Sequence, residues 1–507
     1  MMSAETERRC GMRAASGFWR WTPLILILCL VSGCIPGKKR YLYDEIRKGY
    51  ADGFTSVAPV QSDPERETTD RIDRPVTLAD AIEIALKNSP DKKIAAARIR
   101  KAGADVQEAN AAFYPHLGFY TEYTAADAPS AYLFKTIDQR RLPGDADFNE
   151  PGRLDNFETG FQARLNLYNG GRDYLGRQIA DAGVNISLLD QAAVDNALIA
   201  AVISRFYTAL AARALIGIAE ESVTTVQKQL EIMQTRFEGG GVLRSDLLSL
   251  EVRLAESREE LVRSHSRYQN ALVNLADIMG VAFEPSVRLE AAGMDTPTIP
   301  SDYSSGLAYS FTHRPELERA RVSVVRSRMA LDAAQSTYMP TLDLTGRYYF
   351  DDEKMAYDMD RKNWVVAVML NWDLFTGFST GAAMKRADAM VAEAFAEDHR
   401  TLLAVRREVK SAYLNLDEAR ARRLVAQRSK ILAEASLELV RTQYEGGAAN
   451  ITRYLEAELD RNRAGVRAAA AFYDQETARA EVCRAVGCWV NGQERPQPSD
   501  ANPLQAR

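Results

Sequence analysis

Four short segments of the chain alternate apolar and polar residues at every second position. In the segment after Pro340, one face carries Leu342, Leu344, Gly346, Tyr348 and Phe350. In the segment that follows it, one face carries Trp364, Val366, Val368, Leu370, Trp372 and Leu374. A period of two is typical of strands with one apolar and one more polar face. We therefore expect strands at about 340–350 and 364–375, and by the same pattern at about 115–125 and 157–168.

These segments have the length and the end residues of membrane-crossing strands. A tilted strand of about ten residues crosses a bilayer, and aromatic residues collect at its two ends. An alternative interpretation is a pair of soluble hairpins with one buried face. Four strands are too few for a membrane barrel, since the smallest use about eight and an open edge in lipid leaves backbone groups unpaired. The chain is therefore expected to combine its strands with those of other copies.

Each pair of strands is followed by a long stretch with helical periodicity. No proline occurs from Gly171 to Phe237 or from Gly377 to Tyr444, and helices of this length would extend about 100 Å. Apolar residues step by three and four along the second stretch, at Leu402, Val405, Val409, Ala412, Leu416 and Ala419. This spacing predicts a coiled coil, with the intervening Arg and Glu residues on a solvated face.

A glycine break ends each long stretch and recurs in the sequence. "RFEGGGVLRSDLLSLEVRL" begins at Arg236, and "QYEGGAANITRYLEAELDR" begins 207 positions later at Gln443. Glycine readily adopts the left-handed conformation that caps a helix, so each break predicts the tip of a helical hairpin. The expected tips lie at about 237–245 and 444–452, and their glycines are Gly239, Gly240, Gly241, Gly446 and Gly447.

The repeat extends over most of the chain. "LNLYNGG" matches "WDLFTGF" and "ADIMG" matches "CRAVG" at the same offset of 207, while motifs around Pro90 and Pro115 match those around Pro315 and Pro340 at an offset of 225. The first copy thus carries 18 more residues between Pro115 and Leu165. The sequence predicts two tandem repeats, residues 77–290 and 291–488.

The N-terminus has the pattern of an export signal. Basic residues precede the apolar run "LILILCLV", which is too short to span a bilayer and is followed by "SGC". "VSGC" resembles a bacterial lipobox, which implies a lipoprotein signal peptide over 1–33 and acylation of Cys34. An ordinary secretory signal, or an apolar anchor, is the alternative. Translation could start at Met1 or Met12. Residues 34–76 then form a lipid-anchored strap, and residues 489–507 a disordered tail.

Composition narrows the range of functions. With 46% apolar and 26% charged residues and a net charge of −5, the chain is ordered and has no basic field for nucleic acid. Its four histidines lie far apart in sequence and no Gly-rich phosphate loop is present, so we expect no metal, no cofactor and no enzymatic activity. After export, Cys483 and Cys488 are the remaining thiols. They could bridge across a helix end or stay separate.

From Leu78 to Gly487 the chain resembles the outer-membrane efflux protein (TolC) family, specifically its lipoprotein branch. The resemblance rests on "TLADAIEIALKNSPD", "FYPHLGF", "NLYNGG" with "DLFTG", and the two tip motifs, in this order and in duplicate. It implies an α+β membrane protein that forms a homotrimer. The 12 strands of the trimer would form one β-barrel in the outer membrane, which an α-helical tunnel continues through the periplasm. The tips would close the tunnel and dock a periplasmic membrane-fusion adaptor, which connects to an inner-membrane pump of RND or ABC type.

The resemblance also identifies candidate gate residues near the tips. Tyr444 matches the aromatic residue of the family's second tip and Glu456 its inner acid. Ala449 stands where a basic residue is usual and Arg453 stands at the other acidic position, so the usual acidic ring is altered. In the first copy the candidates are Asp246 and Glu251, and Asp246 is a possible partner of Arg453. For each of these residues the alternative is a surface charge on a solvated helix.

The sequence therefore predicts the outer-membrane channel component of a tripartite efflux or secretion system. It would be a lipid-anchored, passive exit duct opened by the adaptor and pump. The alternative is a structural coiled-coil surface protein without transport activity. The cargo and the class of pump are not encoded in any motif of the chain.

Overall fold

The computed structural model describes residues 75–144, 147, 149–281, 288–290, 298–355 and 358–489. The expected signal peptide, Cys34, the strap up to residue 74 and the tail from residue 490 lie outside the described residues. The chain divides into two units, Met1–Thr68 and Thr69–Arg507, and all of the described residues belong to the second unit.

Helices and strands alternate in the same order in both halves of this unit. The first half contains α3 (Leu78–Asn88), α4 (Pro90–Ala111), β1 (His116–Ala126), α5 (Pro129–Asp138), β2 (Leu154–Tyr168), α6 (Arg172–Glu238) and α7 (Arg244–Met279). The second half contains α8 (Tyr303–His313), α9 (Pro315–Gln335), η2 (Ser336–Tyr338), β3 (Thr341–Asp352), η3 (Met359–Arg361), β4 (Lys362–Asn371), α10 (Ser379–Glu445) and α11 (Ile451–Val486).

Equivalent helices of the two halves have matching lengths. α6 and α10 each have 67 residues, and α7 and α11 each have 36. α6 and α10 start 207 residues apart, and α3 and α8 start 225 apart, which are the offsets of the sequence motifs. α5 is the helix that the first half adds, and it lies in the longer connection between β1 and β2.

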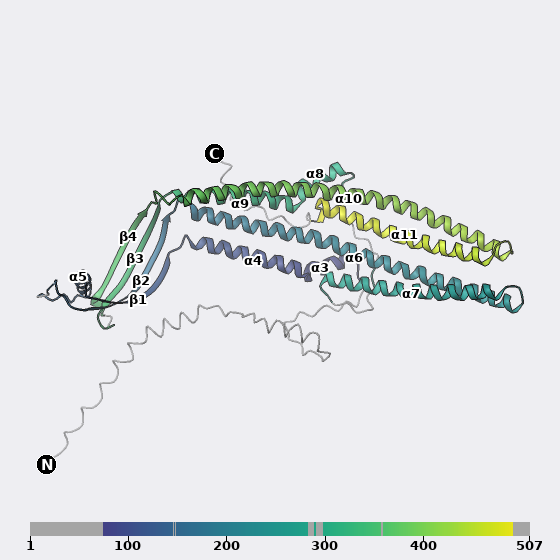
Figure 1. Cartoon of the computed structure of the whole chain (residues 1–507), viewed down its shortest axis with the longest axis horizontal. Coiled ribbons are helices and arrows are strands. Elements are labelled where there is room, and N and C mark those ends of the chain that lie inside the picture. The colour runs from purple at the N-terminus through teal and green to yellow at the C-terminus, as the bar shows by residue number, and fades with distance from the viewer. Residues whose placement is uncertain are drawn as a thin grey trace, which may run out of the picture. The chain divides into compact units, whose positions relative to one another are not determined.

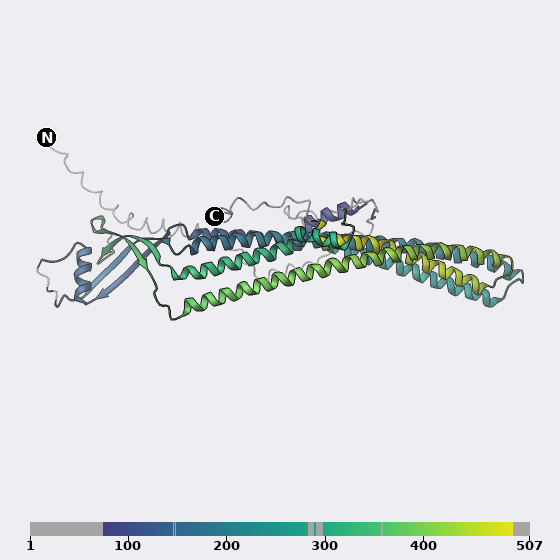
Figure 2. The same ribbon diagram turned by 90° about the horizontal axis from the view of Figure 1, so that it is seen from above.

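The four strands form one antiparallel sheet in the order β1-β2-β3-β4. Within this unit the strands lie at one end of α6 and α10, and the turns of the two long helical hairpins lie at the other end (Figures 1 and 2). β4 ends at Asn371, short of the expected residue 375. The reason is the lack of a partner, since Asn371 pairs with Thr341, the first residue of β3. Beyond it the indole of Trp372 donates to the carbonyl of Tyr338 at 3.0 Å.

Side chains of both halves bury two apolar clusters between the helices. The first cluster joins α3 with the middle of α6 and the end of α7, through residues such as Phe206 and Met279. The second joins α10 with α9 and the end of α11. Of the expected heptad positions on α10, Val405, Val409, Ala412 and Leu416 are buried in this second cluster, Leu402 packs against it, and Ala419 is also buried. By composition and length alone, part of α6 could cross a bilayer. Its apolar residues around Phe206 are instead explained by their burial in the first apolar cluster.

The two shorter hairpin helices end in the same way. Gly280 and Gly487 cap α7 and α11 in the left-handed conformation, with φ of 66° and 87°. A Cβ at Gly280 would lie 3.0 Å from the carbonyl oxygen of Asn88, and one at Gly487 would lie 2.8 Å from that of His313. Both positions require glycine for two reasons. The backbone angle is left-handed, and the end of a neighbouring helix comes too close to leave room for a side chain.

Candidate functional site

The tips of the helical hairpins have the same backbone geometry. Gly240 and Gly447 are left-handed, with φ of 74° and 78°. The amide of Gly241 donates to the carbonyl of Arg236 at 2.8 Å, and the equivalent amide of Ala448 donates to that of Gln443 at 2.7 Å. Glycine thus lets each long helix turn back within a few residues, and the chain presents two similar tips.

An apolar cluster next to the tips holds the two hairpins together. It contains Val226, Met233, Leu250, Leu254, Val440, Ile451, Tyr454 and Ala457, which come from all four hairpin helices. Tyr444 packs against this cluster, with its ring 5.6 Å from that of Tyr454 and its hydroxyl 3.5 Å from the sulfur of Met233. The guanidinium of Arg236 lies over the Tyr444 ring at 5.8 Å. Burial raises the pKa of Tyr444, so its hydroxyl keeps its proton at neutral pH.

The charged gate candidates do not form one cluster in the single chain. Arg453 pairs with Glu456 along α11 at 3.6 Å, and their side chains are 62% and 59% exposed. Asp246 lies in the first turn of α7, where the Ser245 hydroxyl donates to it at 3.5 Å. Glu251 is exposed. Among the described ion pairs, Arg453 therefore pairs with its own helix and not with Asp246, and so exposed a pair adds at most about 1 kcal/mol.

A buried carboxylate that the sequence reasoning missed joins the two hairpins. Glu458 on α11 is 2% exposed. It accepts hydrogen bonds from Ser222 of α6 at 2.9 Å and from Arg253 of α7 at 2.8 and 3.1 Å, and also from Asn462. The sequence carried a signal for it, because Glu458 stands four residues after the buried Tyr454, on the same face of α11. A groove of about 610 Å³ between α6, α7 and α11 runs past this contact.

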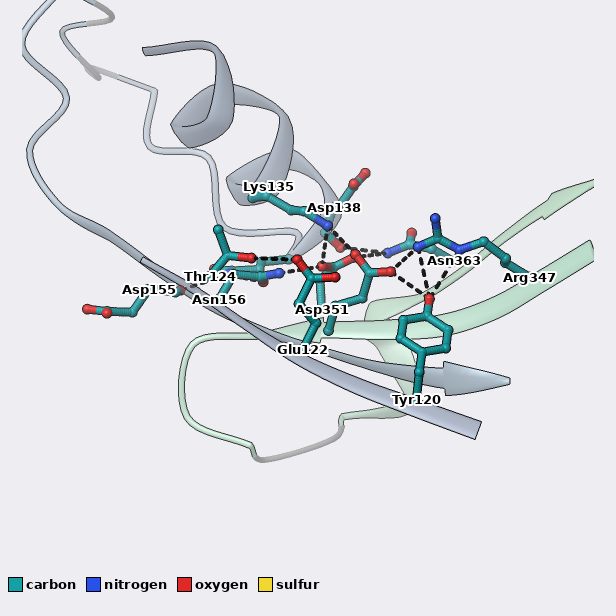
Figure 3. A network of polar contacts seen from close by, with 12 residues as sticks. Tyr120, Glu122, Thr124, Lys135, Asp138, Asp155, Asn156, Arg347, Asp351 and Asn363 are labelled. Carbon is teal, nitrogen blue, oxygen red and sulfur yellow. Dashed lines mark hydrogen bonds and ion pairs between the residues drawn. The ribbon is translucent and has the colours of Figure 1, made fainter. Parts of the chain in front are cut away.

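The other end of the unit has a second polar cluster, on one face of the sheet (Figure 3). Glu122, Glu158 and Asp351 face one another in a single row across β1, β2 and β3. Arg347 binds Glu158 and donates to the hydroxyl of Tyr120 at 2.9 Å, and that hydroxyl donates to Glu158 at 2.6 Å. The polar residues of this sheet face include Tyr120, Glu122, Thr124, Asn156, Glu158, Gln162, Arg164, Asn166, Asp343, Thr345, Arg347, Tyr349, Asp351 and Asn363.

The opposite face of the sheet is apolar and exposed. A row of aromatic residues crosses all four strands, Phe119 beside Phe161, Tyr348 and Trp364, and these side chains are 42–70% exposed. Further along the strands the exposed residues include Leu117, Val366, Val368 and Leu370. A large exposed apolar face marks a surface that is covered by lipid or by protein. Because the other face is charged, the sheet has the two-sided character of a wall between lipid and water.

A family model for outer membrane efflux proteins matches residues 81–281 and 310–488, which is most of the described unit. The chain belongs to this outer membrane efflux protein family. It is therefore an outer-membrane component of efflux or secretion transport, as the sequence resemblance implied.

Relatives and solved structures agree with this assignment. Protein CyaE of Bordetella pertussis is 26% identical over 407 residues, covering 80% of this chain and 82% of the relative. The pyoverdine export outer membrane protein OpmQ of Pseudomonas putida is 23% identical over 413 residues, covering 81% and 85%. The crystal structure of the Campylobacter jejuni CmeC outer membrane channel matches with a TM-score of 0.70 at 19% identity, covering 83% of this chain and 87% of that chain. At this identity the structural match shows the fold.

Proposed function

We propose that three copies of this chain form a gated exit duct, the outer-membrane part of a tripartite efflux or secretion system. The observation that carries the proposal is the sheet, which has one charged face and one exposed aromatic face. Two of its strands lead directly into the two 67-residue helices. Three such sheets supply 12 strands, enough to close a membrane barrel. The apolar face then contacts lipid, the polar face lines the lumen, and the paired helices continue as a periplasmic tunnel about 100 Å long.

The two outer strands support assembly from copies. β1 and β4 are the ends of the sheet order, so each has one edge without a partner in the single chain. Unpaired backbone groups are not tolerated in a bilayer. β4 of one copy pairing with β1 of the next satisfies both edges and closes the ring. The duplicated element order within the chain supports two tandem repeats. The two hairpins of strands in each copy would then occupy nearly equivalent positions in the ring.

The tunnel closes at the tips through packing between the hairpins. Tyr444 and the Glu458–Arg253 contact join the second hairpin to the first in the closed arrangement. Arg453 and Glu456 lie on the first turns of α11, and Asp246 and Glu251 on those of α7, so threefold repetition brings their charges into rings around the opening. Opening is a change between two packed arrangements, in which the hairpins separate at the tip.

The outermost turns of the hairpins dock a periplasmic adaptor. Gly239, Gly240, Gly241, Gly446 and Gly447 leave a backbone surface with few side chains at each tip, which a partner can approach closely. The adaptor connects this end to an inner-membrane pump of RND or ABC type. The relatives include the pyoverdine export protein OpmQ and a proteases secretion protein, PrtF of Dickeya chrysanthemi, so the cargo varies among similar proteins.

The mature chain is held in the outer membrane by lipid as well as by its strands. Acylation of Cys34 after removal of residues 1–33 is supported by the "VSGC" sequence alone. Mass spectrometry of the N-terminal peptide tests this step, with Cys34→Ser as the variant that should lose the acyl chains. An unmodified Cys34 in membrane-extracted protein would refute the anchor and leave the barrel proposal untouched.

Single-channel conductance in planar bilayers tests the duct and its gate. We expect a small wild-type pore whose conductance or cation preference changes in Arg453→Asp and in Glu456→Ala, because each alters a ring of charge at the opening. A wild-type pore that responds to neither substitution would move the gate elsewhere. An inserted oligomer without any pore would contradict the duct and favour a structural surface protein.

A further inference from the structure

The connection between β1 and β2 contains the helix α5, which is not part of the proposed periplasmic gate. α5 follows β1 at the end of the sheet away from the long helices, and it packs on the polar face (Figure 3). In the second half the described part of the equivalent connection contains a single short turn, η3. Each chain therefore contributes one α5.

Charge on the sheet explains why α5 docks there. Glu122, Glu158 and Asp351 stand side by side on three neighbouring strands, and like charges opposite one another repel. Lys135 of α5 reaches between two of them, binding Glu158 and lying 3.0 Å from Asp351, which is fully buried. A buried carboxylate is tolerated when it is paired and hydrogen-bonded. Lys135 therefore reduces the excess of negative charge that Arg347 alone leaves on this face.

Further hydrogen bonds fix the orientation of α5. The amide of Gln139 donates to the side-chain oxygen of Asn156 at 2.7 Å, and Asn156 donates in turn to Asp351 at 2.7 Å. Asn363 of β4 donates to the same carboxylate at 3.2 Å and to the carbonyl of Asp138 at 3.3 Å. The end of α5 is thus tied to β2, β3 and β4 through one connected network, which resists rotation of the helix.

The side of α5 that faces away from this network is apolar. Phe134 is 65% exposed and Ile137 is 41% exposed, and they lie one turn apart on the same side of the helix. Burying large apolar side chains is favourable, so a helix held rigidly with such residues outward favours a partner surface. In the proposed barrel of three copies, the polar face of each sheet lines the lumen. The three copies of α5, which pack on these faces, would then lie around the barrel axis.

We propose that α5 is an outer plug, in which Phe134 and Ile137 of three copies meet on the axis and close the outer mouth of the duct. The ion pairs of Lys135 with Glu158 and Asp351 would hold each α5 over the lumen, and we call Lys135 the latch. The partner of this surface is a second and a third copy of the chain, and the proposal rests on the proposed function. The duct therefore has a closure at its outer end that is independent of the periplasmic tips.

Two kinds of variant test the plug in planar bilayers. Lys135→Met should raise the mean conductance about twofold or more, because the latch is lost and the carboxylates repel, while Lys135→Arg should behave like the wild type. Phe134→Cys leaves the network intact, and its thiols should join chains when an oxidant is added. This joining should lower the conductance, and reductant should restore it.

The outcomes separate the plug from the duct. Wild-type conductance in Lys135→Met, together with no chain joining in Phe134→Cys, would overturn the plug while the duct stands. If Lys135→Met does not assemble, Phe134→Cys decides alone. No pore in the wild type would refute the duct itself, and the plug with it.

A separate observation concerns the two thiols at the end of α11. Cys483 and Cys488 are both buried, in the same apolar cluster between α8, α10 and α11. α11 ends at Val486, and Gly487 then turns the chain back with φ of 87° and an amide bond to the carbonyl of Cys483 at 2.9 Å. In this type of helix end the residue after the glycine meets the residue four positions before the glycine. The turn therefore brings the two thiols together, which a continuous helix would not do.

We infer that Cys483 and Cys488, which are free thiols in the structure, form a disulfide in the oxidising periplasm. Hydrogen bonding from Cys483 lowers the pKa of Cys488, so Cys488 is the better nucleophile. Its thiolate attacks the disulfide of a thiol–disulfide oxidoreductase and forms a mixed disulfide. The Cys483 sulfur then displaces the oxidoreductase thiolate. The chain loses two protons and two electrons, and the oxidoreductase takes up the electrons as its reduced dithiol.

Alkylation and peptide mapping test this bond. Trypsin cuts at Arg484, so an oxidised protein yields the two cysteines in linked peptides. We expect no alkylation of either cysteine in denatured, unreduced protein from the outer membrane, and full alkylation after reduction. Alkylation of both cysteines without reduction would refute the disulfide. Protein from an oxidase-deficient strain serves as the reduced control.

Discussion

At the scale of single residues, the contact between Glu458 and Arg253 is the best-defined tie between the two hairpins. Glu458 is buried, and Arg253 retains partial exposure at 16% of its side chain. A buried carboxylate that loses its partner keeps the cost of desolvation without the compensating hydrogen bonds. The tie would therefore stabilise the proposed closed arrangement mainly through the high free-energy cost of breaking it.

We predict that Arg253→Met destabilises the closed hairpins by about 1.5–3 kcal/mol, the worth of hydrogen bonds to a charged group. The expected results are a lower midpoint of thermal unfolding, measured by helical circular dichroism, and more frequent openings in bilayer recordings. Arg441→Met is the matched control, because Arg441 also pairs with a glutamate near the tip but is exposed.

The double variant Arg253→Met with Glu458→Met provides the second half of this test. Replacing a buried ion pair by apolar residues of similar size is often neutral. We therefore expect the double variant to recover most of the stability lost in Arg253→Met. A double variant as unstable as the sum of the two single variants would mean that the residues act independently and do not form a tie.

At the scale of elements, the helix ends differ in how strictly they need glycine. Gly447 and Gly487 are both left-handed, but a Cβ at Gly447 meets open space, while one at Gly487 meets a carbonyl oxygen at 2.8 Å. The first position needs glycine for its backbone angle alone. The second also needs it for the contact between α8 and the end of α11.

We predict that Gly447→Ala costs about 1 kcal/mol of stability, the ordinary penalty of the left-handed conformation. Gly487→Ala should cost about 1–3 kcal/mol more, because the neighbouring helix end must move. Urea unfolding of both variants in the same detergent measures the difference. Equal losses of stability in the two variants would indicate that the end of α8 moves aside at little cost. The close approach at Gly487 would then have no structural importance.

The elements were predictable from the sequence to the extent that they repeat a local pattern. Val405, Val409 and Leu416 follow the helical period and are buried as expected. Alternation predicted the two faces of the strands, but the end of β4 depends on where β3 starts, which no local pattern contains. α5 was missed because it is short, with ten residues, and because it occupies the unmatched insertion of the first repeat.

The site residues were less predictable, because their contacts join distant parts of the chain. The contact between Asn156 and Asp351 depends on the pairing of β2 with β3 across nearly 200 positions. The family pattern drew attention to Arg453 and Glu456, whose side chains are exposed in the single chain. Glu458, two residues further on, is buried by residues of the other hairpin, and nothing local to α11 specifies those residues.

At the scale of the whole molecule, one helix leaves a stripe of apolar residues exposed. On α10 this stripe lies opposite the buried positions and consists of Leu403, Leu414, Leu424, Val425, Leu432 and Leu439. Exposed leucines in a regular row are typical of a helix face that another helix covers. In the proposed trimer the covering helix belongs to the neighbouring copy.

We predict that Val425→Glu together with Leu432→Glu prevents the trimer from forming, because each charge would be buried between copies. Light scattering of purified protein in detergent measures the mass of the assembly. Gln427→Glu, an exposed position on another side of α10, should leave the trimer intact. A trimer that persists in the double variant would place the interface on a different surface.

The open edges of the sheet have a consequence for inheritance. In the proposed trimer β1 and β4 each pair with another copy, so a chain with a damaged edge would not simply drop out of the assembly. Such a chain could still pair through its intact edge strand. It would then enter a ring that cannot close, because its damaged edge finds no partner. In a cell that makes equal amounts of normal and damaged chain, only about one ring in eight would contain three normal copies. Edge mutations should therefore be dominant, whereas mutations that unfold the chain before it meets its partners should be recessive.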